Sequence, residues 1–403
     1  MNRVAITGIG VVAPGAVGVD AFRGLLRGAE SGVRPVERFD TVGLSAHNAG
    51  LIRDFAPKQF IAPGKMRRMN MLSRFAVSAA HLALLDSGAT IAPESGVVLG
   101  TSFGPVQTSI EYMKEYVEKG AALAPPQLFA ESVANAPGSH IAIEAGFRGF
   151  NVTVTQRESS ALAAAMYAAS QIVKGTVPAA LLGGVEEVNE MIFSVLDRIG
   201  ALAHANGAVG EAARPFDRRR NGLSIGEGSA VLLAESPQQA RDRAKVYGWL
   251  SGFGIGRDTT AKISDWGEGH EQVAAAMRAT IEDADLTLDD IDAVYASANG
   301  TIRGDRLEYR ALQTLFGSRL PPVVATKGWF GEYCAGGALQ LIAALLALGE
   351  QSLHASFGFE EGEPEMQLDV TREARPIALR NVLVNSLSAG GGIVCTVISR
   401  EGS

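Results

Sequence analysis

The chain has 403 residues, with 36 Lys and Arg against 43 Asp and Glu, and hydrophobic residues make up 47% of it. This length allows two or three ordinary domains or one large duplicated unit, and the apolar content excludes a disordered chain. The net charge of −7 offers no electrostatic footprint for nucleic acid or for an anionic membrane surface. We therefore expect a globular α/β protein that binds neither of them.

Cysteine and histidine usage points to a reducing compartment and to no metal. Cys334 and Cys395 are too few for a disulfide framework, and the six histidines are too widely spaced for a local metal-binding motif. No apolar run reaches about 18 residues, and the N-terminal residues lead into a strand-like segment rather than a charged leader. The sequence predicts a cytoplasmic protein with no metal site, export signal or membrane span.

Short β-rich runs alternate with longer Ala- and Leu-rich stretches. This alternation is typical of sheets and helices packed in layers. The predicted strands are residues 4–6, 96–99, 152–155, 179–182, 230–234, 293–296, 322–325, 381–384 and 394–398, and the predicted helices are residues 75–87, 159–174, 271–284 and 338–347. A weak echo of residues 4–12 in residues 245–256 indicates a duplication, with the best divisions at 207–222 and 238–245.

A glycine-rich segment follows the first predicted strand. Gly8, Gly10 and Ala13 fit the loose GxGxxA pattern of dinucleotide-binding loops. Pro14 and Gly15, however, interrupt the helix whose N-terminus would have to hold the phosphates. We therefore interpret the segment as a tight turn at the end of the strand.

Residues 151–166 predict a strand that turns sharply into an Ala-rich helix. Acyl-transfer enzymes place a nucleophile at such a turn, because the free amides and the positive dipole end of the helix point at it. Glu158 occupies the position expected to carry Cys or Ser. Ser159 or Ser160 is an alternative nucleophile, but each lacks a neighbouring base other than Glu158, so hydrogen bonds in the first helical turn are the simpler interpretation.

Five segments, in this order along the chain, carry a resemblance to a known family. They are residues 4–14 (VAITGIGVVAP), 215–228 (PFDRRRNGLSIGEG), 296–301 (ASANGT), 327–331 (KGWFG) and 385–392 (NSLSAGGG). Together they resemble the β-ketoacyl synthases of the thiolase fold over essentially the whole chain. The resemblance implies a five-layered αβαβα fold made of two duplicated halves, which we place at residues 1–240 and 241–403.

The same resemblance assigns the family's catalytic positions, and all of them are changed. Glu158 stands where the family has its acyl-accepting Cys, Asn299 where it has the first His, and Glu332 where it has the second His. Lys327 keeps its motif position. The paired Phe residues of the family's gate loop are replaced by Leu387 and Ala389.

These replacements exclude ordinary condensation chemistry. Glu158 lacks the polarizable thiolate that both attacks and leaves. Asn299 donates a hydrogen bond but carries no proton near neutral pH, and an ionised Glu332 repels developing negative charge. Cys334, two residues beyond Glu332, is a conceivable replacement nucleophile, although filling a small buried site is the simpler interpretation.

A ketosynthase scaffold without its catalytic residues resembles the chain length factor, or ketosynthase β subunit, of type II polyketide synthases. The resemblance implies a heterodimer with a catalytic ketosynthase α subunit, and substrates carried on the phosphopantetheine of acyl carrier protein, with no cofactor held by this chain. The common chain length factor has Gln at the position of Glu158, which leaves the choice between aromatic and polyene products open.

In that fold a helix of the dimer partner closes the far end of the acyl tunnel, so side-chain volume there limits product length. The candidate helix is residues 104–117. Val106, Ser109, Ile110 and Met113 fall at i, i+3, i+4 and i+7, on one face, which we expect to meet the tunnel. An ordinary core stripe remains the alternative.

Two other functions stay open. In the first, the chain is a stand-alone acyl-processing enzyme, such as a malonyl decarboxylase, that uses Glu158 and Glu332 as an acid/base pair. In the second, it is a homodimeric condensing enzyme with an unrecognised nucleophile. If Glu158 has only a structural role, the helix dipole favours its carboxylate, and Arg157 is its expected partner once it is buried.

Overall fold

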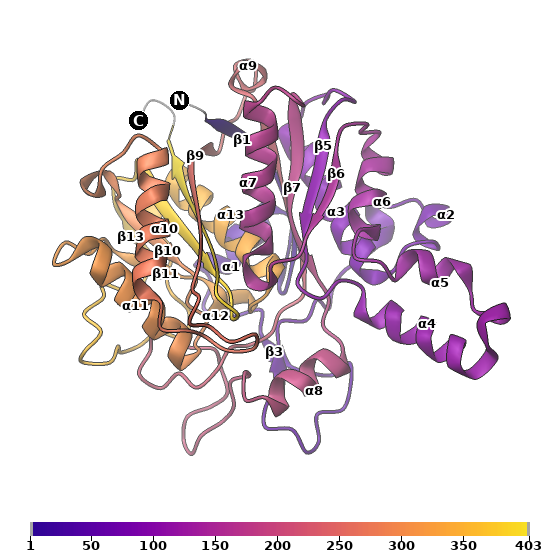
Figure 1. Cartoon of the computed structure of the whole chain (residues 1–403), viewed down its shortest axis with the longest axis horizontal. Helices are drawn as coiled ribbons and strands as arrows, with labels where there is room; N and C mark the ends of the chain where they lie inside the picture. The colour runs from indigo at the N-terminus through magenta and orange to yellow at the C-terminus, as the bar shows by residue number, and fades with distance from the viewer. Residues whose placement is uncertain (1–2, 401–403) are drawn as a thin grey trace.

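The computed structural model describes residues 3–400, without the side chain of Cys334. One large mixed sheet runs through the molecule in the order β11-β10-β14-β15-β9-β1-β8-β7-β5-β6, and β2 pairs with β1 (Figure 1). Its strands are β1 (Val4–Ala13), β2 (Ala16–Val17), β5 (Gly96–Gly100), β6 (Asn151–Val154), β7 (Ala179–Glu186), β8 (Gly228–Glu235), β9 (Gly248–Arg257), β10 (Ala293–Ala296), β11 (Val323–Ala325), β14 (Asn381–Leu387) and β15 (Gly392–Ser399).

The remaining elements are helices and two small ribbons. The ribbons pair β3 (Arg34–Pro35) with β4 (Asn48–Ala49), and β12 (Ser352–Leu353) with β13 (Arg375–Pro376). The α-helices are α1 (Val19–Arg27), α2 (Pro63–Met66), α3 (Met71–Ser87), α4 (Val106–Lys119), α5 (Pro126–Glu131), α6 (Ala136–Ala145), α7 (Ser160–Val173), α8 (Glu190–Arg198), α9 (Pro237–Ala240), α10 (His270–Asp283), α11 (Ile302–Phe316), α12 (Lys327–Phe330) and α13 (Cys334–Glu350). The 3₁₀ turns are η1 (Pro57–Gln59), η2 (Ala121–Leu123), η3 (Arg157–Ser159) and η4 (Leu288–Asp290).

The sheet is built from two copies of one topology. In the first half β1 pairs with β8, then come β7, β5 and β6; in the second, β9 pairs with β15, then come β14, β10 and β11. Each half therefore orders its own strands as first, fifth, fourth, second, third. β1 and β9 join the halves, with Val4 opposite Leu250. The predicted duplication is confirmed, while the division at residue 240 stays a prediction.

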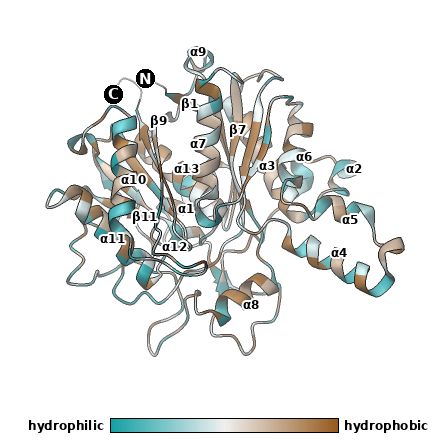
Figure 2. Ribbon diagram, in the orientation of Figure 1, coloured by the Kyte–Doolittle hydropathy of each residue, from teal (hydrophilic) through white to brown (hydrophobic). Residues whose placement is uncertain are grey.

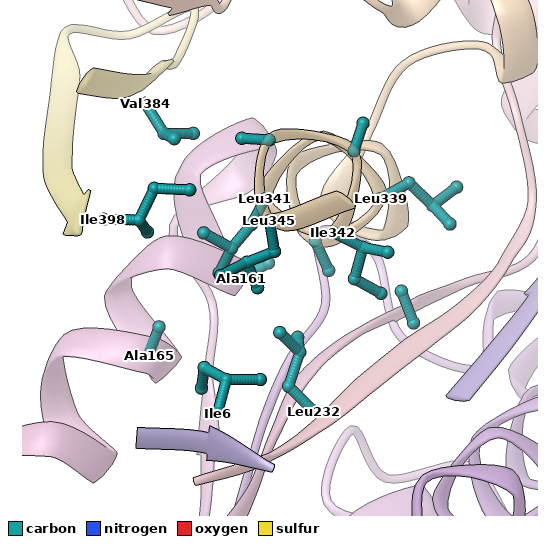
Figure 3. Close-up of a cluster of buried hydrophobic side chains, with 14 of the residues drawn as sticks. Ile6, Ala161, Ala165, Leu232, Leu339, Leu341, Ile342, Leu345, Val384 and Ile398 are labelled. Atoms are coloured by element: carbon teal, nitrogen blue, oxygen red, sulfur yellow. The ribbon is translucent and has the colours of Figure 1, made fainter. Parts of the chain in front are cut away.

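Helices lie between the halves and on both outer faces. The apolar, Ala-rich α7 and α13 contact strands of both halves and fill the central layer. Figure 3 shows buried side chains of this layer, with Ile6 and Ile398 among the labelled residues. α3 and α6 cover the outer face of the first half, and α10 and α11 cover that of the second (Figure 1). Figure 2 shows hydrophilic residues along α10 and α11, whose other sides pack on the sheet. The five-layered thiolase-like fold is thus confirmed.

Every predicted helix and strand is present, but the interpretation of the glycine-rich segment is wrong. Residues 8–13 continue strand β1, so they form neither a dinucleotide-binding loop nor a turn. A Cβ on Gly8 would lie 2.2 Å from the Ala83 carbonyl oxygen, and one on Gly10 would lie 1.8 Å from that of Ala79. The glycines therefore let α3 pack directly on the strand.

Residues 3–400 contain neither a helix fit to cross a membrane nor a cluster placed to hold a metal ion. Within that range, no helix combines the length and the apolar character that crossing a bilayer requires. The same part of the chain contains no cluster of three His, Cys, Asp or Glu side chains placed to hold a metal ion.

Candidate functional site

Glu158 lies at the predicted strand–turn–helix junction. β6 ends at Val154, η3 spans Arg157–Ser159, and α7 begins at Ser160. Arg157 has a φ of 53°, a left-handed conformation that side chains other than glycine seldom adopt. This sharp turn places Glu158 at the N-terminal end of α7, where its side chain is buried.

The environment of Glu158 favours its neutral form. Burial raises the pKa of Glu158 to about 7, and the negative charge of Glu332 raises it as well, whereas Arg157 and Lys327 act in the opposite direction. Oε2 of Glu158 accepts no hydrogen bond, and Nε of Arg157, the expected partner, lies 3.9 Å from it. The carboxyl group therefore titrates near neutral pH rather than remaining a fixed anion.

The other three family positions form one buried network. Nζ of Lys327 lies 2.5 Å from Oε2 of Glu332, and Asn299 Nδ2 donates to the same oxygen at 2.9 Å. Lys327 also donates to the Ser297 carbonyl at 2.7 Å, and the Tyr333 amide donates to Oε1 of Glu332 at 2.8 Å. Both oxygens of Glu332 are thus engaged by fixed donors.

Two further carboxylates, on α11, hold the loop that carries Asn299. Asp305 Oδ1 accepts the amide of Asn299 at 3.0 Å, and Glu308 Oε1 accepts the Ser297 amide and Asn385 Nδ2, each at 2.9 Å. Burial raises the pKa of Asp305 to about 6 and that of Glu308 to about 7. Sequence reasoning missed both residues, since an acidic side chain on a helix usually faces water.

The serines next to Glu158 serve the local backbone. Ser159 Oγ lies 2.6 Å from Ser388 Oγ, and the Ser159 amide donates to the same Ser388 atom at 3.0 Å. Ser160 Oγ donates to the Arg157 carbonyl at 2.6 Å. These contacts agree with the interpretation that the two hydroxyls hold the first helical turn.

The gate-loop positions are close to the network. Leu387 is buried at the end of β14, and its amide donates to Ser297 Oγ at 2.9 Å. Ala389 lines a cleft of about 360 Å³ whose wall also includes Glu158, Tyr333, Trp266 and Ile302. The cleft therefore reaches Glu158, the residue that the sequence resemblance assigns to the family's nucleophile position. The side chain of Cys334, the other nucleophile considered, lies outside the described part of the chain.

The four residues predicted to face an acyl tunnel lie apart from this cleft, on α4. Val106 and Ser109 are half-buried, and Ser109 Oγ donates to the carbonyls of Pro105 and Ser132. Ile110 and Met113 are exposed to 37% and 52%. α4 packs mainly on η2 and α5, and together they extend from the body of the molecule (Figure 1). Their meeting with a tunnel stays a prediction.

Two buried carboxylates at the end of β7 anchor the start of α4. Glu186 accepts the amides of Ser102 and Phe103 at 2.7 and 3.2 Å, and Glu187 accepts the amide of Gln107 at 2.8 Å. Burial raises the pKa of both glutamates to about 7. The position of α4 therefore depends on two side chains that the sequence analysis did not single out.

Comparison with known families agrees with the fold. The family described as Beta-ketoacyl synthase, N-terminal domain, matches residues 1–240, and the one described as Beta-ketoacyl synthase, C-terminal domain, matches residues 247–360. The chain belongs to the β-ketoacyl synthase family.

Similar proteins include 3-oxoacyl-[acyl-carrier-protein] synthases and subunits of polyketide synthases. The chain is 28% identical to 3-oxoacyl-[acyl-carrier-protein] synthase 2 of Vibrio harveyi, over 97% of this chain and 96% of that protein. It is 32% and 30% identical to the alpha and beta ketoacyl synthase subunits of the tetracenomycin polyketide synthase of Streptomyces glaucescens, over 99% of this chain and 97% and 98% of theirs. The solved ishigamide ketosynthase/chain length factor superposes with a TM-score of 0.91 at 28% identity, over 99% of each chain.

Proposed function

We propose that this chain is a non-catalytic chain length factor that pairs with a catalytic ketosynthase in a type II polyketide synthase and shapes the tunnel that limits the polyketide chain. One observation carries the proposal: the strand–helix junction, where the sequence resemblance predicts the nucleophile, holds a buried glutamate beside a Lys327–Glu332–Asn299 network whose hydrogen bonds are already made. The similarity to the tetracenomycin subunits and to the ishigamide ketosynthase/chain length factor supports the assignment to a polyketide synthase.

The network lacks the groups that acyl condensation needs. A glutamate cannot form and release the thioester that a cysteine thiolate forms. Stabilising a developing oxyanion requires donors aimed at an empty position. Lys327 and the Asn299 amide instead donate to Glu332 itself. The geometry therefore favours a structural role for this former active site.

The exposed surface of the arm formed by α4, η2 and α5 supports the proposal that this chain binds a partner subunit. It exposes several large apolar side chains, and exposed apolar patches of this kind mark interaction surfaces. These residues are Ile110, Met113, Tyr116, Val117, Leu123 and Phe129. β6, the last strand of the sheet, also lacks a neighbour on one side within residues 3–400. In the proposal, the catalytic ketosynthase α subunit covers this face.

Acyl carrier protein, with its phosphopantetheine, delivers the growing chain to the complex in this proposal, and this chain holds no cofactor. The face of α4 formed by Val106, Ser109, Ile110 and Met113 then borders the tunnel, and side-chain volume there sets where elongation stops.

A second candidate function is a stand-alone malonyl decarboxylase that uses Glu158 with Glu332. The raised pKa of Glu158, about 7, is the observation that favours it, because a carboxyl that titrates near the working pH can exchange a proton. Against it, Glu332 is held by Lys327, Asn299 and the Tyr333 amide, so it has no free oxygen to serve as the second group.

Incubation of the purified chain with malonyl-loaded acyl carrier protein separates the two functions. The chain length factor proposal predicts no carbon dioxide release above that of the Glu158→Ala variant, and no acyl adduct in the intact-protein mass. Release by the isolated chain that disappears in Glu158→Ala would instead establish the decarboxylase.

A further inference from the structure

An apolar stripe begins just before α4 and continues along it. Its members are Phe103, which precedes the helix, and Val106, Ile110, Met113 and Val117, which are spaced by three and four residues as one helix face requires. Phe103, Ile110, Met113 and Val117 are exposed to between 37% and 75%. The stripe thus has a defined inner end at Phe103, where the chain leaves the body of the molecule.

A second aromatic ring lies directly behind Phe103. The Phe103 and Tyr333 ring centroids are 5.0 Å apart, with the ring planes inclined by 57°. Tyr333 is 2% exposed and belongs to a buried apolar cluster against which Val106 packs. The inner end of the stripe is therefore two rings thick.

Tyr333 also forms part of the wall of the cleft that contains Glu158. The two rings consequently lie between the exposed stripe on α4 and the cleft of about 360 Å³ that contains Glu158. Removing either ring takes volume out of the boundary between the stripe and the cleft.

The backbone of Tyr333 has a strained conformation. Its φ of 102° and ψ of −170° fall in a region that glycine occupies almost alone. Such a conformation persists only where the surroundings fix it, and here the amide is bound by Glu332 and the ring by Phe103. A large side chain at a position suited to glycine requires an explanation beyond chain connectivity.

We propose that the Phe103–Tyr333 ring pair is the end wall of the acyl path along α4 and is a second determinant of product length, separate from the α4 face. This proposal rests on the proposed function, since it assumes that an acyl chain from a ketosynthase partner runs along the stripe. The wall acts by volume, so ring removal lengthens the product, whereas loss of the Tyr hydroxyl alone leaves the length unchanged.

The test co-expresses the chain with the ketosynthase encoded beside it and with its acyl carrier protein, and measures product lengths by mass spectrometry. The variants are Phe103→Ala, Tyr333→Ala and the double variant, with Tyr333→Phe as the matched control that keeps the ring. We expect products longer by at least one two-carbon unit from each ring-removing variant and the parent length from Tyr333→Phe. Phe103 is partly exposed, so its variant reports on the wall even where Tyr333→Ala fails to fold.

Two results would overturn the proposal, and they differ. Unchanged product lengths from variants that still form the complex remove the wall but leave the chain length factor function intact. If the parent chain itself neither binds the ketosynthase nor affects its products, the proposed function is wrong, and the proposed role of the ring pair is wrong as well.

Discussion

Lys327 and Glu332 form an ion pair in the interior of the molecule, with Nζ 2.5 Å from Oε2 and each side chain only 1% exposed. The sequence resemblance predicts Glu332 at the position of the family's second catalytic His and Lys327 at its own motif position. Burying a charge is costly unless it is paired and hydrogen-bonded, and Asn299, Ser297 and the Tyr333 amide complete the set. The pair is therefore a fully bonded part of the protein's interior.

This pair predicts a large and non-additive effect on stability. Lys327→Met or Glu332→Gln alone leaves an unpaired buried charge, and we expect each to lower the free energy of unfolding by about 3–5 kcal/mol. The double variant removes both charges and is expected to lose much less than the sum. Urea unfolding of the four proteins measures the coupling. Single variants that cost under about 1 kcal/mol would show that the pair carries little energy.

The raised pKa of Glu158 predicts how stability changes with pH. Because the folded-state pKa is about 7, above the ordinary value of 4.5, the folded chain holds a proton that the unfolded chain releases between these values. The stabilising contribution is complete below pH 4.5 and is lost as pH rises through 7, on the order of a few kcal/mol.

Glu158→Gln removes that titration. We therefore expect its melting temperature to fall less than the parent's between pH 5 and pH 8. Glu186, Glu187, Glu308 and Asp305 titrate in both proteins and leave a common residual slope. Glu282→Gln, on the exposed side of α10, is the control and should keep the parent's slope. Parallel melting profiles for all three proteins would contradict the buried, titrating Glu158.

Glu187 predicts a local change in the mobility of α4. Its carboxylate accepts the Gln107 amide at 2.8 Å in the first helical turn. In Glu187→Ala this amide loses its acceptor, so we expect faster hydrogen exchange across the start of α4 and unchanged exchange in α10. Glu187→Gln keeps an acceptor oxygen and should restore most of the protection. Equal exchange in parent and Glu187→Ala would mean that other contacts position the arm.

If the face of α4 borders the tunnel, added side-chain volume at Ser109 shortens the product. Ser109→Trp adds volume on the side that carries Ile110 and Met113, and we expect products shorter by one or more two-carbon units. Glu118→Trp places the same ring on the opposite side of the helix, nine residues on, and should leave product length unchanged. Mass spectrometry of the products tests both. Shortening by both variants would indicate a general disturbance of the arm rather than a tunnel wall.

The assignment of Glu158, Asn299 and Glu332 to the family's catalytic positions rests on short sequence segments and stays a prediction. Glu158 at the strand–helix junction and the buried strands were predicted, since local pattern decides them. The Lys327–Glu332 pair was not predicted, although the two residues are only five positions apart, because the pairing depends on how the surrounding loops fold.

Long-range packing explains the other differences. The pattern of Gly8 and Gly10 favours a turn, whereas in the fold both lie inside a strand. The close approach of α3 leaves no room for a side chain there. Asp305 and Glu308 give no signal in the sequence, because only the folded chain brings the amides of Asn299 and Ser297 against their side of α11. Phe103 and Tyr333, more than two hundred residues apart, meet only in the folded chain.

Native mass spectrometry of the chain expressed alone and with the ketosynthase encoded beside it tests the central claim most directly. The account predicts a 1:1 complex with that ketosynthase, and a lone chain that is monomeric or poorly soluble because the apolar side chains of α4 and α5 stay uncovered. A stable homodimer that ignores the ketosynthase would contradict the chain length factor function and would make Glu158 and Glu332 the catalytic candidates.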